Sequence, residues 1–169
     1  MAISTIAGVG AGSSGTILTT GTPQSGGVIQ VVNNTVQTNS TYFSTTSTSL
    51  TSTGFSVTIT PKFSTSKILL IHNAICENAN TNIAMGLTIY RNGTNLATGT
   101  SPSILAGLRG AGAYVDTNLY MQFLDSPAST SALTYTTYMF TQSATSYYGV
   151  NTGGSNSQVL SFTAMEIAA

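Results

Sequence analysis

Hydrophobic and polar residues alternate with a period of two along much of this chain. In residues 54–60, Phe55, Val57 and Ile59 alternate with serine and threonine, which places one side in a core and the other in solvent. Residues 85–90 alternate in the same way. Residues 67–75 are apolar at both sets of positions, a pattern typical of a central strand that is covered on both faces. The pattern therefore predicts β-strands.

Turn signals separate these segments. Asn92-Gly93 favours a tight hairpin, because both central residues of a type I′ turn need a positive φ. No window has the spacing of an amphipathic helix. Many short strands with frequent turns predict an all-β fold, a two-sheet antiparallel β-sandwich of the jelly-roll type over residues 28–169. We expect further strands at residues 28–32, 41–46, 114–124, 132–141 and 158–167.

Residues 1–27 differ from the rest in being dominated by Gly, Ser, Thr and Ala. Such a composition is typical of an extended linker or arm. This segment nevertheless carries apolar residues that a spacer does not need, namely Ile3, Ile6, Val9, Ile17 and Leu18. We interpret residues 1–27 as a docking arm that lies along the surface of a partner.

Charge is scarce, with 5 % charged residues, 41 % hydrophobic residues and a formal net charge of +0. Net charge keeps free monomers apart, so its absence favours a fixed assembly. The four basic residues are scattered, which argues against nucleic acid as a partner. No apolar run approaches about 20 residues, which argues against a membrane. The first residues lack the pattern of a secretory signal, so we expect synthesis in a cytoplasm.

Candidate chemistry is sparse. Residues 10–15 match G-x-G-x-x-G, but the strand, helix and acid that a dinucleotide site requires are missing around them. His72 and Cys76 fall on the same face of a predicted strand, yet two ligands are too few for zinc. We expect His72 to be packed and hydrogen-bonded. Asp125 is expected to accept backbone N–H bonds in the turn that follows it. The sequence predicts no catalytic residue, no metal site and no cofactor.

Tyr147 and Tyr148 precede a segment rich in Gly, Asn and Ser at residues 151–155. Aromatic rings beside neutral hydrogen-bonding groups can bind a sugar by stacking. The alternative is that both tyrosines pack against neighbouring strands or subunits. We therefore treat Tyr147 and Tyr148 as candidate glycan or subunit contacts.

Four segments together resemble small structural proteins of tailed bacteriophages, especially those that infect cyanobacteria and other aquatic bacteria. They are residues 31–70, "IYRNGTNLATG" at residues 89–99, "FLDSPASTSALTY" at residues 123–135 and "SFTAMEIAA" at residues 161–169. They occur in the order in which that family has them.

The resemblance implies a non-catalytic virion surface protein whose β-sandwich head forms a homotrimer. Members of this family serve as capsid decoration, head fibres or tail fibres. The short arm favours capsid decoration or a short head fibre, docked on the major capsid protein or another virion protein. The alternative is a tail-fibre or receptor-binding module that recognises polysaccharide on the host surface.

Overall fold

The structure is a computed structural model, and it describes residues 24–38, 40–99, 101–109, 115–149 and 158–169. Within these residues the regular elements are all β-strands. In chain order they are β1 (Val28–Thr38), β2 (Phe43–Thr45), β3 (Thr51–Ile59), β4 (Lys67–Asn78), β5 (Ala84–Arg91), β6 (Thr94–Asn95), β7 (Ala106–Arg109), β8 (Val115–Asp125), β9 (Leu133–Thr141), β10 (Ser146–Tyr148) and β11 (Gln158–Ile167).

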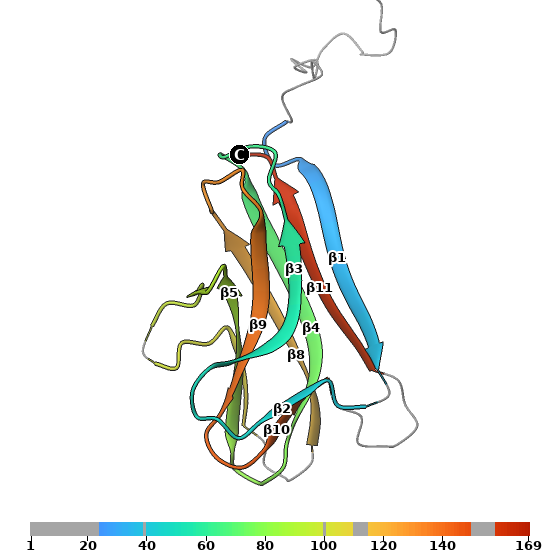
Figure 1. Cartoon of the computed structure of the whole chain (residues 1–169), viewed down its shortest axis with the longest axis vertical. Helices are drawn as coiled ribbons and strands as arrows, with labels where there is room; N and C mark the ends of the chain where they lie inside the picture. Colours follow the sequence, from blue (N-terminus) through green and yellow to red (C-terminus); the bar gives the residue numbers. More distant parts are fainter. Residues whose placement is uncertain (1–23, 39, 100, 110–114, 150–157) are drawn as a thin grey trace, which may run out of the picture.

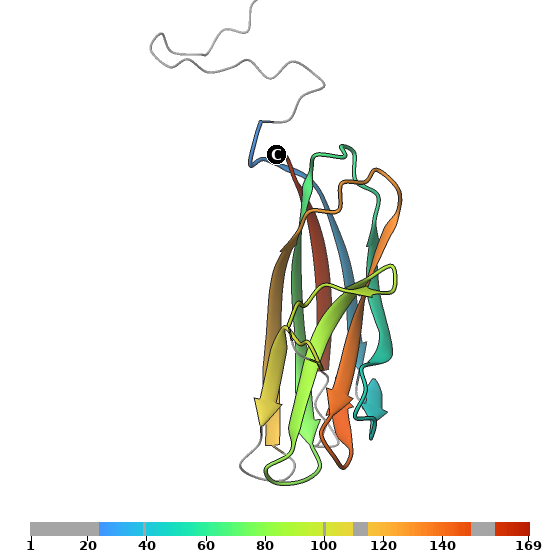
Figure 2. The ribbon, with the colours of Figure 1, turned by 90° about the vertical axis from the view of Figure 1, so that its left-hand side faces the viewer.

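The strands form two antiparallel sheets that pack as a sandwich (Figures 1 and 2). In sheet A, β1 pairs with β11, β11 with β4, and β4 with β8, while the short strands β10 and β2 continue the sheet beside β4. In sheet B, β3 pairs with β9 and β9 with β5, and β6 and β7 both pair with β5. The predicted two-sheet antiparallel sandwich is confirmed.

The pairing is nested. The outermost pair is β1 with β11, the first and last strands of the chain. Inside it lie β3 with β9, then β4 with β8, and finally β5 with β7. Successive pairs alternate between the two sheets. A long antiparallel hairpin that folds over itself in this way is a jelly roll, which agrees with the preferred version of the prediction.

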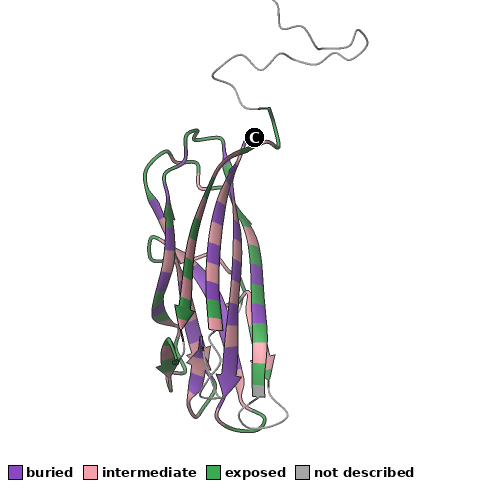
Figure 3. Ribbon diagram, turned by 90° about the vertical axis from the view of Figure 1, so that its right-hand side faces the viewer, coloured by how far each residue is buried: buried purple, intermediate pink, exposed green. Residues whose placement is uncertain are grey.

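The core lies between the two sheets and follows the period of two (Figure 3). Strands β3, β9 and β11 alternate buried residues with more exposed ones; in β9, Leu133, Tyr135 and Met139 are buried. Phe55 on β3 lies at the aromatic centre, in contact with the rings of Tyr42, His72, Tyr148 and Phe162. The inward face of sheet A and that of sheet B therefore form one continuous core.

The strand positions agree closely with those expected from sequence, with three differences. The short strands β7 and β10 were not expected, and β1 continues to Thr38. The expectation that residues 67–75 are covered on both faces is wrong for this chain alone. Ile68, Leu70 and Ala74 face the core, whereas the outward Leu69 and Ile71 remain partly exposed.

Both ends of the sandwich segment meet at one end of the molecule. Gly26 N–H donates to the Ala168 carbonyl oxygen at 2.8 Å, and Ala168 N–H donates to the Gly27 carbonyl oxygen at 2.9 Å. Residues 24–27, which we assigned to the arm, thus already contact the head. Residues 1–23, with the docking residues Ile3, Ile6, Val9, Ile17 and Leu18, lie outside the described residues.

The aromatic centre gives a test of the core. Phe55→Ala should lower the free energy of unfolding by about 3–5 kcal/mol, because it removes a fully buried ring and leaves a cavity. Phe63→Ala is the matched control, since that ring is 36 % exposed and its loss should cost less than about 1 kcal/mol. Chemical denaturation measures both, and equal effects would contradict the assignment of the core.

Candidate functional site

His72 is the only histidine and sits fully buried on the inward face of β4. Its Nδ1 lies 2.8 Å from the Ser161 carbonyl oxygen, and its Nε2 lies 2.8 Å from the Tyr148 hydroxyl. A carbonyl only accepts, so Nδ1 carries the proton and Nε2 accepts from Tyr148. Burial lowers the pKa of His72 to about 4, so the ring is neutral at pH 7. As expected, His72 is packed and hydrogen-bonded.

Tyr148 is fully buried, and the prediction that it contacts a glycan is therefore wrong for its side chain. It lies on β10, pairs with Cys76 on β4, and packs edge-on against His72. Burial raises the pKa of its hydroxyl. The alternative, packing against neighbouring strands, holds for Tyr148. Tyr147 points to the other face of sheet A and is half-buried, so its role as a contact stays a prediction.

Cys76 lies on the same inward face as His72, as predicted, but the two side chains do not form a nucleophile–base pair. The Cys76 thiol is fully buried, and it lies 4.0 Å from the Ala74 carbonyl oxygen. Burial raises the pKa of this thiol, which suppresses the reactive thiolate. Both ring nitrogens of His72 are hydrogen-bonded elsewhere, Nδ1 to the Ser161 carbonyl and Nε2 to the Tyr148 hydroxyl. The arrangement does not generate a cysteine nucleophile.

Glu77 and Asp116 are directly opposite each other on β4 and β8. Glu77 is buried, and one of its carboxylate oxygens has no hydrogen-bond partner. Burial, followed by the neighbouring Asp116 charge and a hydrogen bond with Asp116, raises the pKa of Glu77 to about 7. The two acids are 39 positions apart in the sequence, at residues 77 and 116. Only the strand pairing brings them together at the end of the sandwich opposite the termini.

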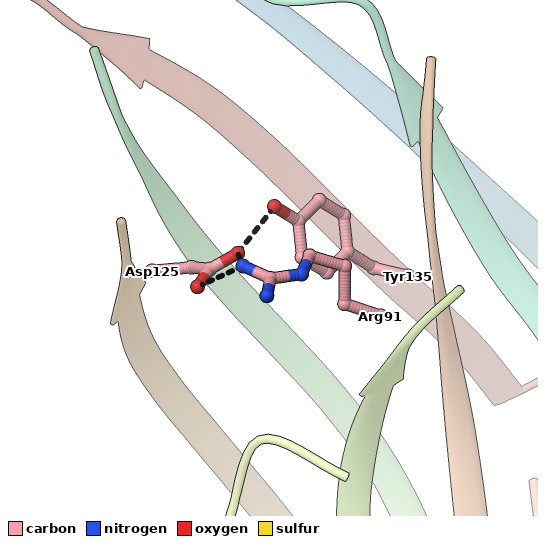
Figure 4. A network of polar contacts seen from close by, with 3 residues as sticks. All are labelled: Arg91, Asp125 and Tyr135. Atoms are coloured by element: carbon pink, nitrogen blue, oxygen red, sulfur yellow. Dashed lines mark hydrogen bonds and ion pairs between the residues drawn. The ribbon is translucent and has the colours of Figure 1, made fainter. Parts of the chain in front are cut away.

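Asp125 links the two sheets at the corner between β8 and β9 (Figure 4). Arg91 on β5 approaches both carboxylate oxygens at 2.8 Å, and the Tyr135 hydroxyl on β9 donates to Oδ2 at 2.7 Å. Burial raises the pKa of Tyr135, and the hydrogen bond to Asp125 and its charge act in the same direction. The expected Asx turn is therefore corrected: this carboxylate accepts from two side chains instead of from the backbone of the turn.

Glu166 on β11 is fully buried and organises the loop between β3 and β4. Its Oε1 accepts from the backbone N–H groups of Lys62 and Phe63 at 2.8 and 3.2 Å, and its Oε2 accepts from Gln30 Nε2 at 2.6 Å. Burial alone would raise the pKa of Glu166, but the hydrogen bonds from Gln30 and the backbone outweigh it and lower the pKa. No sequence pattern indicates this role, because the partners are distant in the chain.

His72, Asp125 and Glu166 form hydrogen bonds that hold separate strands and loops together. Three of the four acids and the single histidine are buried and in contact with other strands or loops. Among the described residues, no three side chains of His, Cys, Asp or Glu gather where they could bind a metal ion. The same part of the chain contains no helix long and apolar enough to cross a membrane. Residues 10–15 and 151–155 lie outside the described ranges.

Comparison with known proteins finds matches among solved structures alone. No protein-family model matches the chain, and neither does any curated protein. Among solved structures, it is similar to infectious bursal disease virus VP2 in a subviral particle, with 11 % identity and a TM-score of 0.48 over 83 % of this chain and 40 % of that chain. A second similar structure is a T=1 particle derived from the same virus, with 14 % identity and a TM-score of 0.47 over 84 % of this chain and 37 % of that one.

Loss of one hydroxyl should destabilise the buried histidine. Tyr148→Phe leaves Nε2 of His72 without its donor inside the core, so the free energy of unfolding should fall by about 1–3 kcal/mol. Tyr120→Phe is the matched control, because that side chain is 54 % exposed and its hydroxyl donates to Gln122 Oε1 at 3.3 Å on the surface of the head, outside the core. Chemical denaturation of both variants checks this, and equal stability of Tyr148→Phe and wild type would contradict the hydrogen-bond assignment.

Glu77 should make the protein less stable as the pH rises. A carboxyl whose pKa is raised from 4.5 to about 7 on folding stabilises the fold below pH 4.5, and that contribution is lost between pH 4.5 and 7. Glu77→Gln should match the wild type at pH 4 and exceed its stability at pH 8 by up to about 3 kcal/mol. Denaturation curves across this range measure the difference.

Glu166→Gln is the matched control for this pH profile. The pKa of Glu166 is lowered on folding, so its contribution is present above pH 4.5 and is lost as the pH falls. This variant should therefore be less stable than wild type at pH 8 and approach it in acid. A constant difference between Glu77→Gln and wild type from pH 4 to 8 would rule out the titration.

Proposed function

We propose that this chain is a non-catalytic structural protein of a tailed bacteriophage virion. One observation carries the proposal: the four segments that resemble such proteins make up most of one jelly roll. They contain most of β1, all of β2 and β3, the start of β4, the turn between β5 and β6, the corner between β8 and β9, and most of β11. The resemblance thus extends over both sheets of the sandwich.

The internal chemistry supports a structural role. His72, Asp125 and Glu166 each satisfy hydrogen bonds between strands or between a strand and a loop. Burial lowers the pKa of His72 and raises the pKa of Cys76, so both side chains are neutral near pH 7, as suits packed core residues. Within the proposal these side chains keep the head folded, while the surfaces of the head and arm make the contacts with other proteins.

In this function the head is a homotrimeric surface module, and residues 1–27 anchor it to the major capsid protein or to another virion protein. The chain enters the sandwich beside Ala168, so an anchored arm presents the opposite end of the head outward. A short arm suits capsid decoration or a short head fibre. The protein is made in the cytoplasm of the host bacterium and is located on the virion surface.

The second candidate function is recognition of polysaccharide on the host surface by a tail-fibre or receptor-binding module. The position of Tyr147 favours it: this partly exposed ring lies at the end of the sandwich away from the arm. Tyr148 is unavailable for this contact because it is buried. The two functions differ in what the particle loses without this chain, which is assembly or stability in one case and adsorption to the host in the other.

Incorporation into particles tests the proposal. Tagged full-length chain and a variant without residues 1–23 are produced in cells infected by a phage that lacks its own copy, and purified particles are probed for the tag. We expect only the full-length chain in particles, because the arm supplies the anchor. A length-matched variant with serine at the five apolar positions of the arm (Ile3, Ile6, Val9, Ile17, Leu18) should also be excluded.

Light scattering and circular dichroism show whether the variants keep the mass and fold of the full-length protein. Normal incorporation of the truncated chain would overturn the docking role of the arm. Absence of the full-length chain from all particles would overturn the virion assignment. Particles that assemble normally without the chain but no longer adsorb to host cells would favour the second function.

A further inference from the structure

The outer face of sheet A carries an apolar row that crosses four strands. The register aligns Leu124 on β8 with Leu69 on β4, Leu69 with Met165 on β11, and Met165 with Val31 on β1. Directly opposite residues in an antiparallel sheet place their side chains next to each other on one face. The row is therefore a continuous apolar band on a surface that faces away from the core.

Exposed apolar residues concentrate on this face. The structure has eight exposed large hydrophobic residues within the described ranges, and five of them lie here: Val28, Val31, Tyr120, Leu124 and Val159. Val31, Tyr120 and Leu124 are each more than half exposed. Single exposed apolar residues are normal on a monomer, but a contiguous group marks an interaction surface.

Sheet B shows what a covered outer face looks like in the same molecule. There Gly86 on β5 lies beneath Ile104 and Phe140, so closely that an added Cβ would come within 2.8 Å of the Ile104 side chain. Thr88, which also points outward, is fully buried and donates to Asn95. The chain covers this part of sheet B with its own connection between β5 and β7. Sheet A keeps its apolar band exposed.

The charges on the outer face of sheet A lie at its two ends. Lys67 stands at the end near the termini, and Glu77 and Asp116 stand at the opposite end. Between them the face presents only apolar and neutral polar side chains. Interface cores are depleted in charged residues in the same way. A second copy of this chain, with net charge +0, meets no repulsion on approach.

Within the described part of the chain, the edge of the same sheet is also left uncovered. β1 is an eleven-residue edge strand without a charged residue or a proline, and β11 pairs with only one of its sides. Proteins normally protect such edges with lysine, proline or a covering segment, because a free edge can pair with another chain. The open edge borders the apolar row at Val31, so one partner can cover both.

From these observations we infer that the outer face of sheet A, with the β1 edge, is the surface through which copies of this chain associate. The inference rests on the proposed homotrimer and specifies its interface. Four strands about 4.8 Å apart and some 30 Å long offer roughly 600 Å² of projected area. A standard interface buries about 800 Å² of accessible surface on each partner, which is of the same order as the area of this face.

The mass of the full-length protein in solution tests the inference. Wild type should give three times 17.4 kDa by light scattering, and Val31→Lys/Leu124→Lys should give the monomer mass, because two charges are placed in the apolar row. Both positions are about half exposed in a single chain, so the fold should tolerate lysine. The matched control is Thr58→Lys/Phe63→Lys, which adds the same charge at exposed positions off this face and should stay trimeric.

A second measurement probes directly whether the outer face of sheet A is covered in the trimer. Tyr120→Cys places a thiol on the proposed interface, whereas the native Cys76 is buried. The new thiol should react slowly with a maleimide in the trimer and quickly when Val31→Lys/Leu124→Lys is also present. Thr58→Cys, exposed on the outer face of sheet B, should react quickly in both backgrounds.

The outcomes separate this inference from the proposed function. A wild-type trimer that survives the double lysine substitution, with the thiol of Tyr120→Cys fully reactive, would overturn the interface but leave the trimer intact. A trimer that survives while incorporation into particles is lost would assign the face to an unlike virion protein and would also overturn the inference. A monomeric wild type at all concentrations would overturn both the trimer and the interface.

Discussion

The nested antiparallel pairing is the constraint on which the rest of this structure depends. β1 can pair with β11 only when the whole intervening chain has folded back, and β3 with β9 has the same requirement. Closing such long loops costs conformational entropy, which is recovered when the two sheets bury their inward faces against each other. The buried polar contacts fall where this closure needs them. Asp125 joins the sheets at the corner between β8 and β9, and Glu166 holds the loop that connects β3 to β4.

Much of this architecture could be predicted from sequence, because the period of two directly encodes which side chains face the core. Strands with strong alternation, such as those containing Phe55 and Met85, were found close to their observed bounds. The strand β10 was not predicted, because a segment of three residues is too short to show a period. The burial of Tyr148, which lies on this strand, was not predicted for the same reason. The partners of Asp125, Glu77 and Glu166 could not be predicted, since they lie on strands that only the tertiary pairing brings together.

The few acidic residues of this chain are used mainly inside the structure. With four acidic residues in the chain, placing Glu77, Asp125 and Glu166 in buried positions leaves little negative charge for the surface. Arg91 is likewise held by Asp125. The exterior is covered mainly by hydroxyl and amide groups, which are hydrated but do not repel another copy of the same surface. A neutral exterior and an internal use of charge therefore favour permanent association over existence as a free monomer.

β4 connects the internal architecture with the external surface. Its inward residues, from Ile68 to Cys76, complete the core, and its outward residues Leu69 and Ile71 form the middle of the exposed apolar band. A strand that is apolar at both sets of positions is normally covered on both faces. In the single chain the outer face of β4 is partly exposed, whereas the sequence pattern indicates that this face is covered. A neighbouring copy would cover it. The inferred interface would thus account for the apolar pattern of residues 67–75 on both faces of β4.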